Sequence, residues 1–501
     1  MTAARLVEMT REMVRESAIP ASCLGIGLIS VFTELSYINP PFHAYRDPAL
    51  LFALFDAATI LLAVVIAVCT RLGRAPRTLV SRNRNLAACC GLLVLSTCVN
   101  FCAQMVGAEG LPVYAVAAIV GGLGVALLFV MWFEVVSHLS PVQLALCYAL
   151  AAIGRVAVIW VCSGMAIDRL WACLCAVAVA STALLAAARD AVSSRESVID
   201  GLAGEPATIS GGTASTAGPQ EKLCRFPLKP LMVVITGTLL LSFVLHSIGN
   251  AWGTNGNPGV VIACAVVAVF LIRKRESFEF KRLWQASLVF MTVGVLLFVL
   301  LRGTGALMAA GMFTCMAYEL CLMLMYSILG NLVFRNFYNS TFLYAVELAV
   351  ALAAGHLGNS LATLLTDKTS PDPSPAFIAV ACALGVVFAL VCARSFSKRS
   401  LRDTWGTIVA TPMSQDFDLV IEKTRLGLRC HELAQEADLS RREEEVLLLL
   451  AQRKKPAVIA EQLNIEPSTV TTHRKHVYQK LDVHSAKQLQ ERIGSCEEEG
   501  A

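Results

Sequence analysis

The residues from Leu50 to Cys69 read LLFALFDAATILLAVVIAVC and contain one charged side chain, Asp56. A helix that crosses the hydrocarbon core of a bilayer needs about 20 predominantly apolar residues. We therefore expect this stretch to span a membrane. Similar stretches recur along the chain, so the class of protein follows from their number and spacing.

Twelve apolar runs meet this description or come close to it. The predicted spans begin near residues 18, 49, 86, 112, 141, 168, 231, 258, 284, 304, 340 and 375. The run from Pro258 to Ile272 is short, whereas that from Pro375 to Ala393 is long and nearly uncharged. The first run follows basic residues without a clear small-residue cleavage site, so we interpret it as a retained helix.

The composition of the whole chain supports a polytopic membrane protein. Of the 501 residues, 56% are hydrophobic and 16% are charged, and the mean hydropathy is +0.64. Soluble domains carry about 25% charged residues, so a water-soluble enzyme of this size is excluded. Disorder is excluded because apolar residues are plentiful. At least 14 of the 18 cysteines lie in apolar runs, where they act as small hydrophobic side chains.

The distribution of Lys and Arg predicts the orientation of the spans. With the N-terminus in the cytoplasm, nineteen Lys and Arg residues between the spans or before them face inward and four face outward. Cytoplasmic loops of membrane proteins carry such an excess. An even number of spans then returns the C-terminus to the same side. We therefore expect a multi-pass protein of the bacterial cytoplasmic membrane with both termini in the cytoplasm.

The longest interruption lies between Arg189 and Pro230 and divides the spans six and six. Its Gly, Ser, Thr and Ala residues are typical of a flexible linker. This organisation resembles the major facilitator superfamily of transporters. The segment RLGR at residues 71–74 resembles the end of that superfamily's D-R-x-G-R loop motif, with Thr70 where an acidic residue is expected. The resemblance implies two six-helix halves around a central cavity.

Several ionisable side chains lie inside the apolar runs, where a charge costs about 2.5 kcal/mol or more at the bilayer centre. The ligand or sensing candidates among them are Glu34, Asp56, Arg155, His246, Glu319 and Glu347, with His356 in the same span as Glu347. A buried guanidinium requires a carboxylate partner or an anionic ligand, and each of the four carboxylates could pair with Arg155. The alternative role for these residues is structural, as ion pairs or as side chains that reach the membrane interface.

The C-terminal part is polar and predicts three or four short helices. Ser440 is a suitable N-cap, and Glu443 three residues later completes a capping box. Pro467 is expected to begin a later helix, whose apolar stripe consists of Val470, Val477 and Leu481. The opposite face carries hydroxyl groups and cations, namely Thr471, Thr472, Arg474, Lys475 and Tyr478. Such a helix suits the major groove of DNA. Residues 451–490 hold seven basic and three acidic side chains, an excess that attracts phosphates.

The stretch from Leu439 to about Arg492 resembles the LuxR-type helix-turn-helix, also called GerE or FixJ/NarL-type, over its whole length. The matching residues are Leu439, Arg442, Glu443, Glu445, Val446, Leu447, Ile459, Ala460, Leu463, Ile465, Thr469, Val470, His473, Lys480, Leu481 and Val483. Two departures are Glu466 at the cap of the last matching helix and Thr471 where a lysine is usual. The segment at residues 453–456 replaces a turn that usually contains glycine.

The LuxR resemblance also implies roles for individual residues. It implies that Thr471, Thr472 and Lys475 face base edges, that Lys480, Lys454 and Lys455 lie near phosphates, and that a last helix from Ser485 to Arg492 forms a homodimer. Phosphate contacts position such a module, and base contacts select its site.

The predicted fold class is all-α, a bundle of about twelve membrane helices followed by a small four-helix soluble domain. The predicted parts are an N-terminal segment at 1–17, spans one to six at 18–188, a cytoplasmic linker at 189–230, spans seven to twelve at 231–393, a second linker at 394–438 and the helix-turn-helix domain at 439–495.

The expected function is a one-component transcriptional regulator, in which the bundle senses an unknown small molecule or condition and the tail binds double-stranded promoter DNA. The alternatives are a transporter with a regulatory DNA-binding tail and a tail that binds protein. The tail has no P-loop, nucleophile elbow or metal-ligand cluster. We therefore expect neither an enzyme nor a bound metal or cofactor.

Overall fold

The computed structural model describes residues 19–38, 48–73, 78–105, 111–139, 141–203, 228–248, 256–273, 280–301, 307–334, 338–365, 374–395, 429–430, 433–434, 436–451, 459–460, 466–486, 488–489 and 492. Every regular element within these ranges is a helix, which confirms the predicted all-α class. The chain forms two compact units. One contains residues 1–189 and 216–412, and the other contains residues 190–215 and 413–501.

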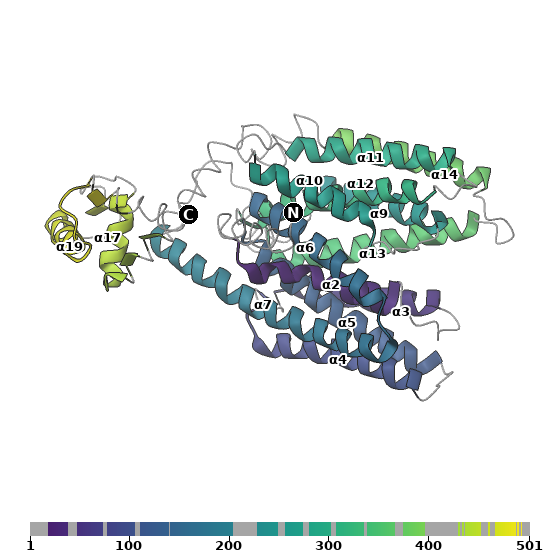
Figure 1. The fold of residues 1–501 in the computed structure, drawn as a ribbon, viewed down its shortest axis with the longest axis horizontal. Helices are drawn as coiled ribbons and strands as arrows, with labels where there is room; N and C mark the ends of the chain where they lie inside the picture. The colour runs from purple at the N-terminus through teal and green to yellow at the C-terminus, as the bar shows by residue number, and fades with distance from the viewer. Residues whose placement is uncertain are drawn as a thin grey trace. The chain divides into compact units, whose positions relative to one another are not determined.

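The first unit is a bundle of apolar helices (Figure 1). Its first half begins with a compound helix, in which a 3-10 segment at Ala21–Gly27, α2 at Leu28–Thr33 and a π-helical segment at Glu34–Ile38 follow one another. The remaining helices of this half are α3 (Pro48–Arg71), α4 (Asn83–Met105), α5 (Leu111–Val136), α6 (Pro141–Ser163) and α7 (Ile167–Ala203). The second half consists of α9 (Leu228–Ile248), α10 (Pro258–Arg273), α11 (Phe280–Leu300), α12 (Leu307–Phe334), α13 (Ser340–Leu365) and α14 (Pro375–Ser395).

Ten of the described helices are long and apolar enough to cross a membrane. Two shorter apolar stretches, Leu231–His246 and Pro258–Ile272, complete the series in α9 and α10. All twelve predicted runs are therefore helical. The two halves meet where α3 packs against α13 and where α6 packs against α10 and α12. This is the six-plus-six arrangement that the sequence resemblance implied.

Two glycines of the first half occupy positions that other residues would not fit, one because of close packing and one because of its backbone conformation. A Cβ atom on Gly122 of α5 would lie 2.3 Å from the carbonyl oxygen of Phe55 in α3, so only glycine permits this approach. Gly73 follows the end of α3 with a φ of 68°, a conformation that favours glycine. The glycine of the RLGR segment therefore has a structural role at a helix terminus.

The linker predicted from residue 189 begins as helix. α7 is 37 residues long and continues through Ala203. The rest of that linker lies outside the described residues.

The second unit contains α17 (Arg441–Ala451) and α19 (Pro467–Lys480). One apolar cluster joins Leu447 and Leu448 to Val477 and Leu481, and it also includes Cys430 and Leu433. A second cluster consists of Leu449, Ile459, Ala460 and Val470. The module thus has a hydrophobic core of its own. It begins before the predicted boundary at residue 439, because Cys430 and Leu433 belong to its core rather than to a linker.

Candidate ligand cavity and DNA-binding helix

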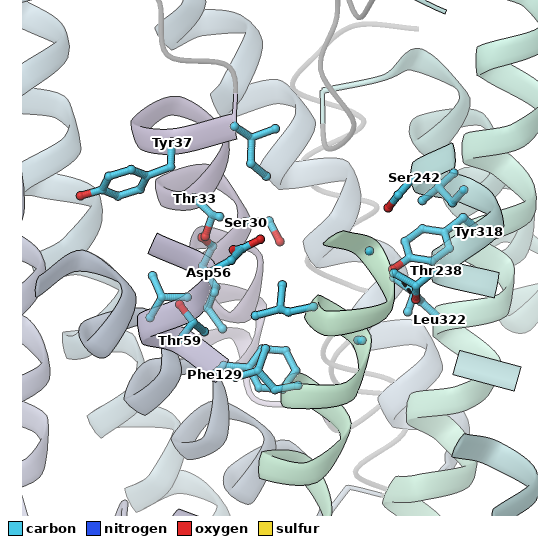
Figure 2. A pocket seen from close by; sticks show the side chains of 18 of the residues that line it. Ser30, Thr33, Tyr37, Asp56, Thr59, Phe129, Thr238, Ser242, Tyr318 and Leu322 are labelled. Carbon is cyan, nitrogen blue, oxygen red and sulfur yellow. Dashed lines mark hydrogen bonds between the residues drawn. The ribbon is translucent and has the colours of Figure 1, made fainter. Parts of the chain in front are cut away.

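The membrane unit encloses a cavity of about 620 Å³ between its two halves. In Figure 2, Asp56 and Thr33 lie on one side of the cavity, and Thr238 and Tyr318 lie on the opposite side. The lining reaches Ile38 at the end of the first span and Asn359 near the end of α13. Because Phe133 in the last turn of α5 also belongs to the lining, the cavity extends from near the end of α5 to the end of the bundle predicted to face outward.

Arg155 and Glu319 form a buried ion pair within this cavity. Arg155 lies in α6 of the first half and Glu319 in α12 of the second, and both side chains are 5% exposed. Arg155 Nη2 donates a hydrogen bond to Glu319 Oε1, and the hydroxyl of Tyr148 donates to Glu319 Oε2 at 2.9 Å. Of the four carboxylates that could pair with Arg155, Glu319 is the partner in the structure.

A second pair crosses the two halves at Asp56 and His356. Nε2 of His356 in α13 lies 2.7 Å from Oδ2 of Asp56 in α3. The Asp56 side chain is 5% exposed, whereas that of His356 is 27% exposed. The imidazole also contacts the ring of Phe52, with 5.5 Å between centroids. This pair is ionic only when His356 is protonated.

The remaining predicted sensing residues divide into two groups. His246 lines the cavity, and its Nδ1 lies 2.6 Å from Oδ1 of Asn359. Glu34 and Glu347 are buried, but they are not among the residues that line the cavity. The structure therefore brings Asp56, Arg155, His246 and Glu319 to one cavity and leaves the other two carboxylates in the surrounding core.

Glu134 lies in the last turn of α5 and joins segments of both halves. Its buried carboxylate accepts hydrogen bonds from the backbone N–H groups of Leu79 at 3.0 Å and Val80 at 2.9 Å. It also accepts a hydrogen bond from the hydroxyl of Thr341, in the first turn of α13. One carboxylate thus holds the segment after α3 against the start of a helix in the other half.

Glu134 is absent from the predicted site residues, although the signal that identified the others applies to it. It is an acidic residue inside an apolar run, in the sequence VMWFEVV. What sequence patterns cannot supply is its set of partners, because Thr341 lies 207 positions away.

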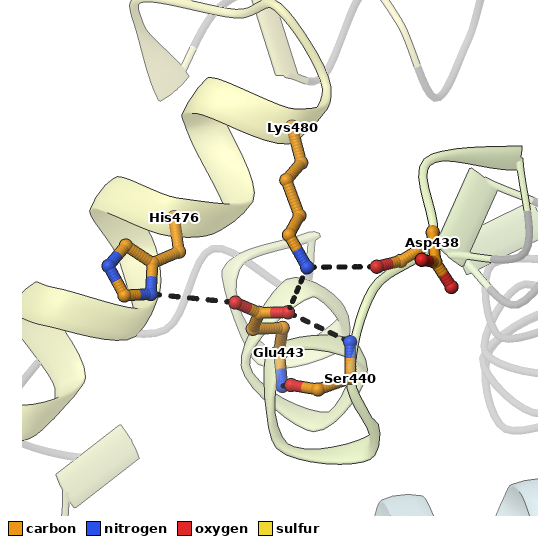
Figure 3. A network of polar contacts seen from close by, with 5 residues as sticks. All are labelled: Asp438, Ser440, Glu443, His476 and Lys480. Atoms are coloured by element: carbon orange, nitrogen blue, oxygen red, sulfur yellow. Dashed lines mark hydrogen bonds and ion pairs between the residues drawn. The ribbon is translucent and has the colours of Figure 1, made fainter.

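The capping box of the second unit is confirmed. The backbone N–H of Ser440 donates to Glu443 Oε2 at 2.8 Å, and the N–H of Glu443 donates to Ser440 Oγ at 3.4 Å. Glu443 also contacts α19, because Lys480 Nζ lies 2.9 Å from Oε2 and His476 Nδ1 lies 3.5 Å from Oε1 (Figure 3). The carboxylate therefore joins the start of α17 to α19.

These contacts set the acidity of Glu443. Burial alone would raise the pKa of the Glu443 carboxyl. The hydrogen bonds from Lys480 and Ser440, together with the positive charge of Lys480, outweigh burial and lower the pKa to about 2. Glu443 is consequently ionised at neutral pH, as its ion pair with Lys480 requires.

The structure of α19 separates an apolar stripe from a polar face. Val470 and Val477 are fully buried, and Leu481 is 4% exposed, as the heptad-like spacing predicted. Pro467 begins the helix after Glu466, which makes no side-chain capping hydrogen bond. The exposed residues of the predicted DNA face are Thr471, Thr472 and Lys475.

Other predicted DNA contacts take different positions. Arg474 is half-buried, and Tyr478 packs against the core of the module. Lys480 donates to the carbonyl oxygen of Asp438 at 2.8 Å in addition to Glu443. Its ammonium thus has two partners within the module, and the Lys480 side chain remains 40% exposed, so the phosphate contact expected of it stays a prediction. Lys454 and Lys455 lie outside the described residues.

The segment predicted to form a dimer is described in part. Helical residues occur at 486, 488, 489 and 492, and Leu489 is buried in the core of the module. The backbone N–H of Gln488 donates to Ser485 Oγ at 3.1 Å, which caps this short helix. Leu489 thus faces inward and contributes to the fold of the module itself.

α17 and α19 pack against each other through a shared apolar core, and α19 carries an exposed polar face. Residues 437–491 match the family described as bacterial regulatory proteins, luxR family. Curated protein sequences give no match to the chain.

Solved structures similar to the chain include three transport proteins. The E. coli fucose:proton symporter FucP is 14% identical, with a TM-score of 0.48, over 77% of this chain and all of that chain. The proton:xylose symporter XylE is 14% identical, with a TM-score of 0.47, over 77% of this chain and 97% of that chain. A bacterial homologue of the iron transporter ferroportin is 12% identical, with a TM-score of 0.49, over 74% of this chain and 99% of that chain.

Proposed function

We propose that this chain is a membrane-embedded one-component transcriptional regulator. Its membrane unit senses a small molecule in the cavity between the halves, and its LuxR-type module binds promoter DNA. The observation that carries the proposal is the presence, in one chain, of a membrane bundle with a polar cavity and a module whose residues 437–491 match a family of bacterial regulators. No catalytic step is part of this function.

The proposal places the protein in the bacterial cytoplasmic membrane, with the N-terminus and the DNA-binding module in the cytoplasm. The excess of Lys and Arg at one end of the bundle supports this orientation. Glu134 then lies near the cytoplasmic end of α5, and the cavity extends toward the outside. A ligand reaches the cavity from the outer side in this arrangement.

Signal transfer requires two states of the bundle with different affinities for the ligand. The Arg155–Glu319 and Asp56–His356 pairs both join one half to the other, and both line the cavity. A ligand that enters this space contacts the same side chains that hold the halves together. Binding therefore changes the relative stability of the bundle states, and this change alters the DNA-binding or dimeric state of the module.

Recognition of DNA is assigned to the exposed face of α19. Thr471, Thr472 and Lys475 reach base edges in the major groove, and the half-buried Arg474 supports the phosphate contacts. The segment from Ser485 to Arg492 forms the homodimer on a two-fold operator. Lys454 and Lys455 complete the phosphate contacts.

The deciding experiment measures DNA binding by the full-length protein in lipid nanodiscs. The DNA is the region upstream of the gene for this chain, and an unrelated fragment of equal length is the control. We expect a specific complex that weakens with salt and with Lys475→Ala. Failure to bind any fragment at low salt, or binding that Lys475→Ala leaves unchanged, contradicts the proposal.

The cavity between two six-helix halves also supports a second function, transport coupled to regulation. Uptake into proteoliposomes separates the two. A regulator binds its ligand without net uptake, whereas a transporter accumulates it, and accumulation that stops on substitution of Arg155 favours the second function.

A further inference from the structure

We infer that the cavity recognises a monocationic organic amine with an apolar body, whose ammonium group takes the place of His356 at Asp56. The inference rests on the proposed sensing function and specifies the chemistry of its ligand.

The charges that line the cavity favour a cation. The ionisable side chains of Asp, Glu, His and Arg in the lining are Asp56, Arg155, His246, Glu319 and His356. Arg155 and Glu319 neutralise each other in a direct pair. Once the imidazole of His356 is displaced, Asp56 loses the partner that lies 2.7 Å from its carboxylate, and its negative charge requires another cationic partner. An anion would meet this carboxylate in a poorly hydrated space, where repulsion between like charges is strong.

His356 is a partner that an amine can replace. An aliphatic amine has a pKa of about 10, so it carries a full positive charge at neutral pH and can pair with the Asp56 carboxylate. The His356 side chain is 27% exposed and lines the cavity, so it has room to move aside. Arg155 offers no comparable opening, because its carboxylate partner is also held by Tyr148.

The aromatic side chains that line the cavity suit the rest of such a ligand. Phe52 and Phe55 lie on the same helix as Asp56, and Phe129 and Phe133 line the cavity from α5. Aromatic faces attract organic cations and bury apolar groups. A volume of about 620 Å³ lies within the range of sites for drug-sized molecules.

Displacement of His356 from Asp56 by the ligand would link ligand binding to a change in the bundle. Asp56 lies on α3 and His356 on α13, which pack against each other across the two halves. An amine that displaces the imidazole removes one contact between the halves and adds a contact within the first half. The bundle state in which α13 moves away from α3 therefore gains stability when the ligand is bound.

The test uses purified full-length protein and three probes that share a phenylalkyl body. These are 4-phenylbutylamine, the neutral 4-phenylbutan-1-ol and the anionic 5-phenylpentanoate. Binding is measured at neutral pH by thermal stabilisation and by titration of intrinsic tryptophan fluorescence, with millimolar probe. We expect the amine to raise the Tm and the other two to have little effect. Equal stabilisation by the alcohol or the carboxylate, or no response to the amine, overturns the inference.

Three variants locate the site. Asp56→Asn weakens amine binding at least tenfold, as expected for loss of a charge-assisted hydrogen bond. His356→Gln tightens amine binding, because the competing imidazole is gone. Glu347→Gln, a buried carboxylate outside the lining, leaves it unchanged. If Asp56→Asn does not fold, His356→Gln decides, and unchanged or weaker amine binding in that variant overturns the inference. Because no DNA is present, failure here is distinct from failure of DNA binding.

Discussion

Glu443 of α17 and Lys480 of α19 lie 2.9 Å apart, and this ion pair connects the capped start of one helix to the end of the other. The same carboxylate accepts the backbone N–H of Ser440. The sequence identifies Glu443 as one half of a capping box. In the structure its side chain also makes the tertiary contact that positions α19. The fold of the module and the placement of its DNA-binding face therefore depend on one side chain.

Replacement of Glu443 by Gln is expected to lower the free energy of unfolding of residues 415–501 by about 1–3 kcal/mol at pH 7, since hydrogen bonds to a charged group are lost. The folded-state pKa of about 2 lies below the ordinary value of 4.5, so the carboxylate stabilises the module fully above pH 4.5. This contribution is lost as the pH falls from 4.5 toward 2. Urea denaturation at a series of pH values measures both effects.

The control for Glu443→Gln is Glu466→Gln, which changes an exposed carboxylate of the same module that makes no side-chain capping hydrogen bond. It should leave the free energy of unfolding within about 0.5 kcal/mol of the original. If the free energy of unfolding of Glu443→Gln falls between pH 4.5 and pH 2 in parallel with that of the unmodified module, Glu443 is not the group that titrates.

Lys475 and Lys480 are expected to respond differently to replacement. Lys475 is exposed on the polar face, so Lys475→Ala should weaken DNA binding by about 1–3 kcal/mol or reduce the salt slope by about one, with little change in stability. Lys480 is held by Glu443 and Asp438, so Lys480→Met should lower stability more than DNA affinity. Fluorescence anisotropy over a range of salt concentrations, with urea denaturation of the same variants, measures both. If Lys480→Met instead weakens DNA binding more than it lowers stability, Lys480 contacts a phosphate.

Arg155 and Glu319 are expected to couple strongly. Removal of either charge alone, in Arg155→Met or Glu319→Gln, leaves an unpaired charge or an unsatisfied group and should cost about 3–5 kcal/mol. The double variant Arg155→Met/Glu319→Leu should recover much of that loss. Thermal unfolding of the full-length protein in detergent measures the cycle. Additive losses in the double variant would show that the two side chains do not act as a pair.

Glu134→Ala should loosen the segment after α3. The N–H groups of Leu79 and Val80 lose their acceptor, so their amide hydrogens should exchange faster with solvent. Hydrogen–deuterium exchange of peptides that cover residues 78–82 measures the change. Glu347→Ala removes another buried carboxylate as the control, and equal exchange in both variants would exclude a specific role for Glu134.

Asp482→Gly should stabilise the helix-turn-helix module. Asp482 follows the end of α19 with a φ of 54°, a conformation that costs a side-chain-bearing residue about 1 kcal/mol and glycine almost nothing. We expect a gain of about 0.5–1 kcal/mol in urea denaturation of residues 415–501. A loss of stability would indicate that the Asp482 side chain has a favourable contact that outweighs the backbone strain.

The elements of both units follow closely from the sequence. Each apolar run is a local property, so the run from Leu50 to Cys69 predicts α3 without knowledge of its neighbours. Ser440, Glu443 and Pro467 likewise predict helix starts, because capping depends on residues a turn apart. The boundaries were less accurate. α7 extends to Ala203, and Cys430 joins the core of the module, since packing recruits residues beyond the periodic pattern.

The composition and the order of the apolar runs by themselves determined a membrane bundle joined to a helix-turn-helix module, because span length, capping and amphipathic periodicity are encoded within a single helix. Only the tertiary structure decided which charges meet. Four carboxylates were open to Arg155, and packing selected Glu319, which lies 164 positions away. Packing also set Asp56 against His356 and joined segments of both halves through Glu134. A buried charge requires a partner, but the identity of that partner depends on which helices become neighbours.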